Sequence, residues 1–151
     1  MSQTMPRLSY FSVLMYTLTG RRAYRGTPDS QAGFLQLTTT GRKSGEQRTI
    51  DLIYIRDGSA YVVTASNGGR RSNPGWFFNL QSNPEALIHT GDTQMRVVAE
   101  VVGPEKRREL WARLVQIAPM YSGYERRTQR EIPMVLLSPA ADSGAAPTSA
   151  P

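Results

Sequence analysis

A short basic segment carries the side chains best suited to bind an anion. Residues 38–45 read TTTGRKSG, so two glycines flank the cations Arg42 and Lys43. In a tight turn, consecutive backbone N–H groups can form a nest for an anion. A guanidinium can bind a phosphate or carboxylate with two parallel hydrogen bonds. The spacing matches neither a P-loop nor a Rossmann fingerprint. The pattern indicates an anion-binding turn, and a solvated basic hairpin is the alternative.

A second polar cluster reads SNGGRRSNPGWFFNL. Here a strand is expected to meet the start of a helix, with Pro74 at the first helical position, and the free N–H groups of a helix start favour an anion. The glycines allow another group to approach the backbone closely. The aromatic run supplies either a wall for a planar ring or part of the core. Helical spacing directs Phe77 and Leu80 inward. It turns Trp76 and Asn79 toward a cleft.

The composition excludes several classes of site and partner. The 151 residues contain no cysteine, which excludes disulfides and thiolate chemistry. The single histidine, His89, leaves no partner for a histidine metal site, so we expect no metal. The net charge of +6 favours anionic partners such as phosphate, polyglutamate or a membrane surface. Nucleic acid is disfavoured, because the aromatic residues do not alternate with lysines as they do in proteins that bind single strands.

The coarse pattern predicts one antiparallel α+β domain. Strands are expected over 34–40, 47–56, 59–66, 85–90, 93–102 and 133–138, and helices over 74–81 and 104–117. The Asp57-Gly58 pair marks a hairpin. Strands joined by hairpins, with helices inserted between them, favour a barrel-like fold over a doubly wound sheet. The predicted domain is 1–138, and the predicted disordered tail is 139–151.

Residues 6–24 also have the apolar spacing of a helix, followed by Arg21, Arg22 and Arg25. This helix either lies across the domain or docks on anionic lipid. No apolar run is long enough to span a bilayer, and the first residues lack the order of a signal peptide. The expected location is the cytoplasm, with peripheral contact at the inner membrane left open.

Three runs of sequence together resemble a known family. Residues 37–48, 54–58 and 66–80 are similar to the deazaflavin-dependent nitroreductases of actinobacteria, and the TGRKSG and NPGW runs are the most distinctive. The likeness continues in matching order over residues 6–138, including the Tyr121 and Tyr124 pair. The resemblance implies a split β-barrel, antiparallel and mostly β with flanking helices. It also implies coenzyme F-420, an 8-hydroxy-5-deazaflavin with a phosphate and an oligoglutamate tail.

The resemblance further implies roles for individual residues. The basic turn matches the segment that binds the phosphate and tail, and residues 48–54 match the strand that lines the deazaflavin ring. Ser66, Tyr121 and Tyr124 match residues at the substrate and are the expected catalytic residues. The expected cofactor contacts are Thr38, Thr39, Thr40, Gly41, Arg42, Lys43, Arg48, Asp51, Leu52, Ile53, Tyr54, Ser66, Asn67, Gly68, Gly69, Asn73, Pro74, Trp76 and Asn79.

The implied activity is hydride transfer from the reduced coenzyme to an electron-poor small molecule such as a quinone, an enone or a nitro-aromatic. Two residues depart from the family pattern. Asn67 stands where a lysine is common, and Arg127 stands where aromatic character is often found. The alternatives are a split-barrel protein that binds FMN and one that binds a lipid without catalysis. Monomer and homodimer both remain open.

Overall fold

The computed structural model describes residues 31–141 of the chain. The predicted N-terminal helix and most of the predicted tail therefore lie outside the described residues. Within residues 31–141, no helix has both the length and the hydropathy needed to cross a membrane. At the C-terminal side the barrel continues past the expected domain boundary, because the last strand reaches Pro139 and the Ala140 N–H donates to the Arg96 carbonyl at 3.0 Å.

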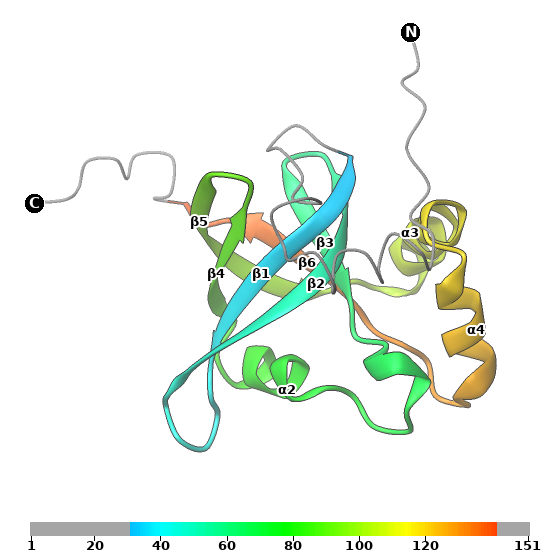
Figure 1. Ribbon diagram of the computed structural model, residues 1–151, viewed down its shortest axis with the longest axis horizontal. Helices are drawn as coiled ribbons and strands as arrows, with labels where there is room; N and C mark the ends of the chain where they lie inside the picture. The colour runs from blue at the N-terminus through cyan, green and yellow to red at the C-terminus, as the bar shows by residue number, and fades with distance from the viewer. Residues whose placement is uncertain (1–30, 142–151) are drawn as a thin grey trace, which may run out of the picture.

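Six antiparallel strands close into a barrel, as Figure 1 shows. Their order around the barrel is β1-β2-β3-β6-β5-β4. This confirms the expected α+β barrel. The strands are β1 (Ala32–Thr40), β2 (Gln47–Asp57), β3 (Ala60–Thr64), β4 (Glu85–Thr90), β5 (Thr93–Val101) and β6 (Met134–Pro139).

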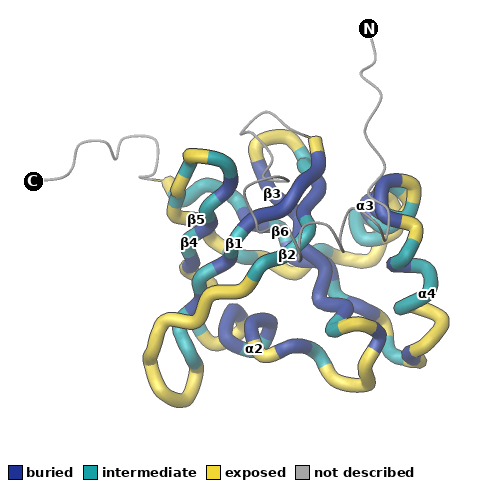
Figure 2. Tube along the Cα trace, viewed as in Figure 1, coloured by how far each residue is buried: buried dark blue, intermediate teal, exposed yellow. Residues whose placement is uncertain are grey.

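Two apolar cores hold the molecule together, one inside the barrel and one outside it (Figure 2). Alternating residues of β1, β2 and β3 fill the interior, where the Tyr54 and Tyr61 rings meet edge to face at 5.0 Å. Helix α2 (Gly75–Ser82) adds Phe77 and Leu80 to this core. Both residues point inward, as the helical spacing predicted.

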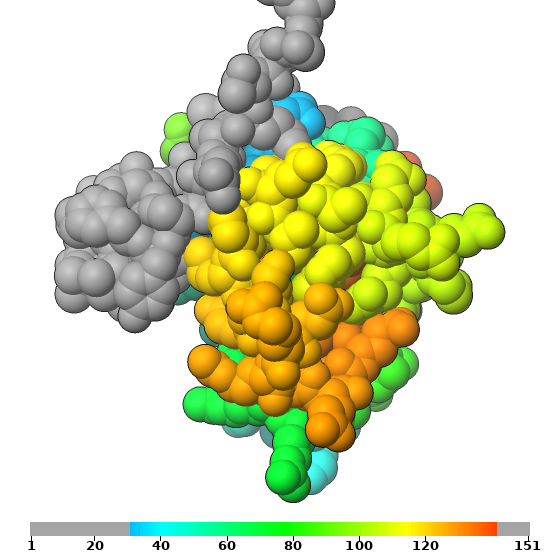
Figure 3. Space-filling view, turned by 90° about the vertical axis from the view of Figure 1, so that its right-hand side faces the viewer, coloured from blue at the N-terminus to red at the C-terminus, as the bar shows by residue number. Residues whose placement is uncertain are grey.

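The outer core lies between the barrel and two helices, α3 (Pro104–Ile117) and α4 (Met120–Arg127). Ile55 and Val62 on the outer side of β2 and β3 pack against Leu110 and Leu114 of α3. In the space-filling view, α3 and α4 form a continuous layer over this face (Figure 3). Because α4 is fixed in this layer, its tyrosines have a defined position beside the barrel.

The barrel splits where β2 leaves β3. Strand β2 pairs with β1 over Gln47–Ile55, but it pairs with β3 only over Tyr54–Asp57. The first half of β2 is therefore bonded on one side only, among the described strands. Figure 1 shows this half and its hairpin extending past the barrel beside α2. A groove can open between the free edge of β2 and the segment that joins β3 to α2.

That segment differs from the sequence expectation. The strand predicted over 59–66 ends at Thr64, and a short 3-10 turn, η2 (Asn67–Gly69), follows. Asn67, Gly68 and Gly69 have φ values of 49°, 65° and 84°, in the left-handed region, so the chain turns out of the sheet there. Helix α4 was not predicted, since Pro119 comes directly before it and Gly123 lies within it.

Candidate active site

Two adjoining pockets lie along the open edge of β2. The first, called here the basic pocket, has a volume of about 710 Å³ and lies between the β1–β2 loop and the start of α2. The second, the aromatic pocket, has a volume of about 770 Å³ and lies between the η2 loop and α4. Their shared wall consists of Ile50, Asn67, Pro74 and Trp76. Together they form one groove with two chemically different ends.

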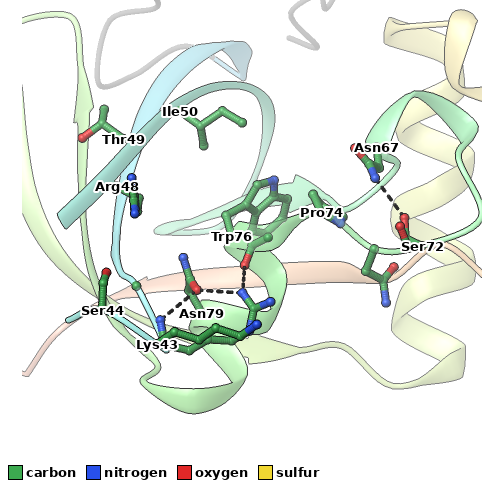
Figure 4. Close-up of a pocket in the computed structure, with 14 residues that line it drawn as sticks. Lys43, Ser44, Arg48, Thr49, Ile50, Asn67, Ser72, Pro74, Trp76 and Asn79 are labelled. Carbon is green, nitrogen blue, oxygen red and sulfur yellow. Dashed lines mark hydrogen bonds between the residues drawn. The ribbon is translucent and has the colours of Figure 1, made fainter. Parts of the chain in front are cut away.

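Asn79 builds the floor of the basic pocket (Figure 4). Its side-chain oxygen accepts hydrogen bonds from the Arg42 backbone N–H at 3.1 Å and from the Arg42 guanidinium at 3.2 Å. Its amide nitrogen donates to the Thr39 hydroxyl at 3.1 Å. The Arg42 guanidinium also lies 5.2 Å from the centre of the Phe78 ring. Arg42 is therefore a cation held in place, and it ties the basic loop to α2.

The other cations of the basic pocket are less constrained. The exposed Lys43 side chain forms no hydrogen bond or ion pair with residues 31–141. Arg48 pairs with Glu46 at 3.5 Å, but both side chains are more than 60% exposed, so water and salt weaken this pair. No Asp or Glu lines either pocket. With the start of α2 at Gly75, the basic pocket presents positive charge to any ligand that enters.

The aromatic pocket combines tyrosines with hydroxyl groups. Tyr121 and Tyr124 line it from α4, Thr64 and Ser66 line it from the end of β3, and Arg127 stands at its margin. The Tyr121 ring packs edge to face against Tyr124 at 5.3 Å and against Trp111 at 6.3 Å. Burial, and then the neighbouring Tyr124, raise the pKa of the Tyr121 phenol well above its ordinary value. Tyr121 is therefore a neutral hydrogen-bond donor at physiological pH.

Arg130, which the sequence analysis did not single out, fixes the segment between β3 and α2. Its guanidinium donates to the carbonyls of Ala65 at 3.2 Å, Ser66 at 3.0 Å and Arg70 at 3.0 Å. It also donates to the Asn73 side-chain oxygen. This segment contributes residues to both pockets, so one side chain outside the groove holds the wall of each. A basic residue before Ile132-Pro133 carries no local signal of that role.

Most of the expected cofactor contacts come together in the groove. In the basic pocket these are Gly41, Arg42, Lys43, Arg48, Asn67, Asn73, Pro74, Trp76 and Asn79. In the aromatic pocket they are Leu52, Ser66, Asn67, Gly68, Gly69, Pro74 and Trp76, beside the expected catalytic residues Tyr121 and Tyr124. Figure 4 shows the Trp76 ring at the centre of the basic pocket, with Ile50 above it and Asn79 below it in this view.

Six expected contacts do not line either pocket, and strand geometry explains most of them. Successive residues of a strand face opposite sides. Tyr54 is fully buried in the barrel core, and Ile53 packs against the outer core. The Thr38 hydroxyl bonds that of Thr49 at 2.8 Å. The six residues outside the lining are Thr38, Thr39, Thr40, Asp51, Ile53 and Tyr54.

The structure adds lining residues that the sequence analysis did not name as contacts. Ile50 belongs to the wall that both pockets share, and Thr64, Arg70 and Arg127 line the aromatic pocket. Residues two apart in a strand face the same side, so Ile50 could have been inferred from Leu52, and Thr64 from Ser66. Asn67, where the family often has a lysine, donates to the Ser72 carbonyl at 3.0 Å and so helps to shape the loop. No group of His, Asp or Glu within residues 31–141 could hold a metal ion.

Comparison with known proteins gives a consistent result. The family model described as F-420H(2)-dependent quinone reductase matches residues 15–139. An F-420H(2)-dependent quinone reductase of Mycobacterium tuberculosis is 42% identical over 126 residues, which cover 79% of this chain and 80% of that protein. The residues that the family model matches include the β1–β2 loop, the η2 loop and α4, which contribute to the lining of the two pockets.

Solved structures agree with the sequence match. An F-420-H2 dependent reductase superposes with a TM-score of 0.65 at 32% identity, covering 70% of this chain and 93% of that one. A second structure, described as a domain-swapped dimer, has a TM-score of 0.65 at 29% identity, covering 85% of this chain and 99% of that one.

Proposed function

Because the chain belongs to the family of F-420H(2)-dependent quinone reductases, we propose that its two pockets divide the work of that reaction. The protein is an oxidoreductase that uses coenzyme F-420 and acts on quinones. In our proposal the basic pocket binds the phosphate and oligoglutamate tail of the coenzyme, and the aromatic pocket binds the quinone. The coenzyme ring lies at the shared wall, beside Ile50 and Trp76.

The observation that carries this proposal is the charge distribution along the groove. Its basic end holds Arg42, Lys43 and Arg48, and no acidic residue lines the groove, so a polyanionic tail would meet only attractive or neutral groups. Arg42 is already oriented by Asn79 and Phe78, which lowers the entropic cost of binding. The residues present therefore fit this coenzyme.

The chain's own contribution to the chemistry is position and hydrogen bonding. When bound, the reduced coenzyme supplies a hydride from C5 of its ring. The apolar wall of Ile50 and Trp76 orients the ring, and the groove holds the acceptor beside it, so that proximity supplies much of the rate. The neutral Tyr121 phenol donates a hydrogen bond to a quinone oxygen as negative charge develops there.

Proton delivery in this scheme uses solvent. The raised pKa of Tyr121 makes its phenol a poor source of a proton, although it remains a good hydrogen-bond donor. The exposed Arg70 and Arg127 line the same pocket, so its mouth is polar and open to water. A water molecule admitted there supplies the one proton that, together with the hydride, completes the hydroquinone.

The test combines binding and turnover. We expect the purified protein to quench the fluorescence of oxidised coenzyme F-420 in a saturable manner. We also expect it to oxidise the reduced coenzyme when menadione is added. The absence of quenching would favour one of the alternatives. A yellow purified protein would then indicate FMN, and a co-purified acyl chain would indicate a lipid-binding protein without catalysis. An enone and a nitro-aromatic belong in the same acceptor panel.

The cellular setting is also a proposal. We infer a cytoplasmic location, which the absence of cysteine supports because it fits a reducing compartment. Peripheral contact with the inner membrane would bring the groove close to lipid-soluble quinones. The basic cluster Arg21, Arg22 and Arg25 supports that contact by its charge. Fractionation of cells into soluble and membrane portions, with and without high salt, measures it.

A further inference from the structure

Two hydroxyl groups that line the aromatic pocket form no side-chain hydrogen bond within the described part of the chain. The structure buries six polar residues there: Thr39, Thr64, Ser66, Asn79, Thr90 and Thr128. Four of them form side-chain hydrogen bonds to other described residues. The two exceptions, Thr64 at 6% exposure and Ser66 at 8%, both line the aromatic pocket.

Both side chains are largely covered, but neither hydroxyl belongs to the buried atoms that lack a partner, so both open onto the pocket. Two hydroxyl groups on the same wall of one pocket are therefore not engaged by the described protein groups. They are available to donate to a ligand that accepts hydrogen bonds.

We propose that Thr64 is a quinone-binding residue whose hydroxyl donates a hydrogen bond to a carbonyl oxygen of the acceptor. The inference rests on the proposed function and extends it to a residue outside the expected site. Val63 and Ala65 face the barrel core, so Thr64 and Ser66 face the opposite side. Pairing of Thr64 with Met134 across β3 and β6 holds the position rigidly.

The donors in this pocket also indicate the class of acceptor. The hydroxyl groups of Thr64, Ser66, Tyr121 and Tyr124 line the pocket together with the cations Arg70 and Arg127, and no carboxylate does. Such a set suits an oxygen atom that gains negative charge during reduction. The two arginines would repel an acceptor with a positive charge. We therefore expect a preference for quinones over cationic acceptors of similar redox potential.

The test compares Thr64→Val with Thr64→Ser. Valine keeps the shape of threonine and removes the hydroxyl, so kcat/KM for menadione should fall about tenfold, the loss of one hydrogen bond to a developing anion. Serine keeps the hydroxyl and should retain most of the activity. The affinity for oxidised coenzyme F-420 should stay the same in both variants. A Thr64→Val variant with unchanged kcat/KM overturns the inference, and so does a loss confined to coenzyme affinity.

A second readout needs neither coenzyme nor quinone. In the protein without ligand, Thr64→Val should leave the melting temperature unchanged, because the hydroxyl faces the pocket and bonds no described protein group. The matched control is Thr90→Val. The Thr90 hydroxyl is buried and donates to the Phe34 carbonyl at 3.2 Å, away from the groove. That variant should melt at a lower temperature with kcat/KM unchanged.

The two measurements also separate this inference from the proposed function. If the unaltered chain reduces menadione and Thr64→Val both matches its activity and lowers the melting temperature, Thr64 has a structural role and only the inference fails. If the unaltered chain neither binds coenzyme F-420 nor reduces quinones, the proposed function fails and the inference fails with it. Lower activity with an unchanged melting temperature supports both.

Discussion

At the scale of single residues, the two central cations of the basic loop have different roles. Arg42 is bonded to Asn79 and stacked on Phe78, whereas Lys43 is exposed and forms no hydrogen bond or ion pair with the described residues. The sequence indicated both as anion ligands, because charge and flanking glycines are visible in it. It could not show that one of them would also anchor the loop, since Asn79 lies 37 residues away.

This difference predicts distinct effects of substitution. Lys43→Ala should weaken the binding of coenzyme F-420 several-fold without changing the melting temperature. Arg42→Ala should weaken binding and also lower the melting temperature, because the loop loses its bonds to α2. The double variant should bind at least tenfold more weakly, by fluorescence titration. Equal affinity in the double variant and the unaltered chain would exclude an anchoring role for this loop.

Tyr121 predicts a pH dependence of stability. Burial, followed by Tyr124, raises the pKa of Tyr121 above the ordinary value of 10.0. Above about pH 10 the unfolded chain loses this proton while the folded chain retains it, so stability falls as pH rises. Tyr121→Phe should remove that part of the decline, measured as urea midpoints between about pH 9 and pH 11. An identical decline in the variant would mean that the phenol ionises normally in the folded protein.

At the scale of elements, the wall of the groove depends on a contact between two loops. The segment between β3 and α2 is held in place by the Arg130 side chain, which comes from the loop between α4 and β6. Arg130 donates to three carbonyl groups and to Asn73 in the segment between β3 and α2. Arg127 adds a bond to the Gly68 carbonyl at 3.2 Å. A side chain at Gly69 would crowd α4, because an added Cβ would lie 3.1 Å from the Tyr124 carbonyl oxygen. The η2 loop and α4 therefore form one packed unit.

Arg130→Ala should disturb both pockets together. The loss of these hydrogen bonds should lower the free energy of unfolding by roughly 2–3 kcal/mol. It should weaken coenzyme binding and raise KM for the quinone in parallel. Arg130→Lys should restore little, since an ammonium cannot reach acceptors in several directions at once. Arg126→Ala, at the same end of α4, is the control and should behave as the unaltered chain. If only the coenzyme affinity or only the KM for the quinone changed, Arg130 would not support a wall that both pockets share.

Local sequence patterns predicted most of these elements and missed the rest for identifiable reasons. Alternation and the Asp57-Gly58 turn predicted β1, β2 and β3 in their correct order. Helix α4 was missed because an eight-residue helix that begins beside Pro119 has weak periodicity. The contacts of Arg130 were missed because they span 57 to 65 residues of sequence.

At the scale of the whole molecule, closure of the barrel depends on pairings that no local pattern indicates. β1 pairs with β4, β3 with β6, and β5 with β6. Only the resemblance to a family implied them. The same closure brings Thr64, from β3, beside tyrosines from α4 that are more than 50 residues away, which is why the aromatic pocket could not be assembled from the sequence alone.

The net charge of +6 and the groove without acidic residues predict how binding responds to salt. The affinity for coenzyme F-420 should fall steeply as ionic strength rises, because the tail is a polyanion. The deazaflavin nucleoside, which lacks phosphate and tail, should bind more weakly and with little dependence on salt. Titration of both ligands at low and high salt measures this. Equal affinities would place the binding energy in the ring alone.

The most direct measurement is a crystal structure of this protein with oxidised coenzyme F-420. We expect the phosphate and tail beside Arg42, Lys43 and Arg48, and the ring against Ile50 and Trp76, with the aromatic pocket left open for the acceptor. A ligand bound elsewhere, or one bound with its tail toward Tyr121 and away from the basic loop, would contradict the assignment of both pockets.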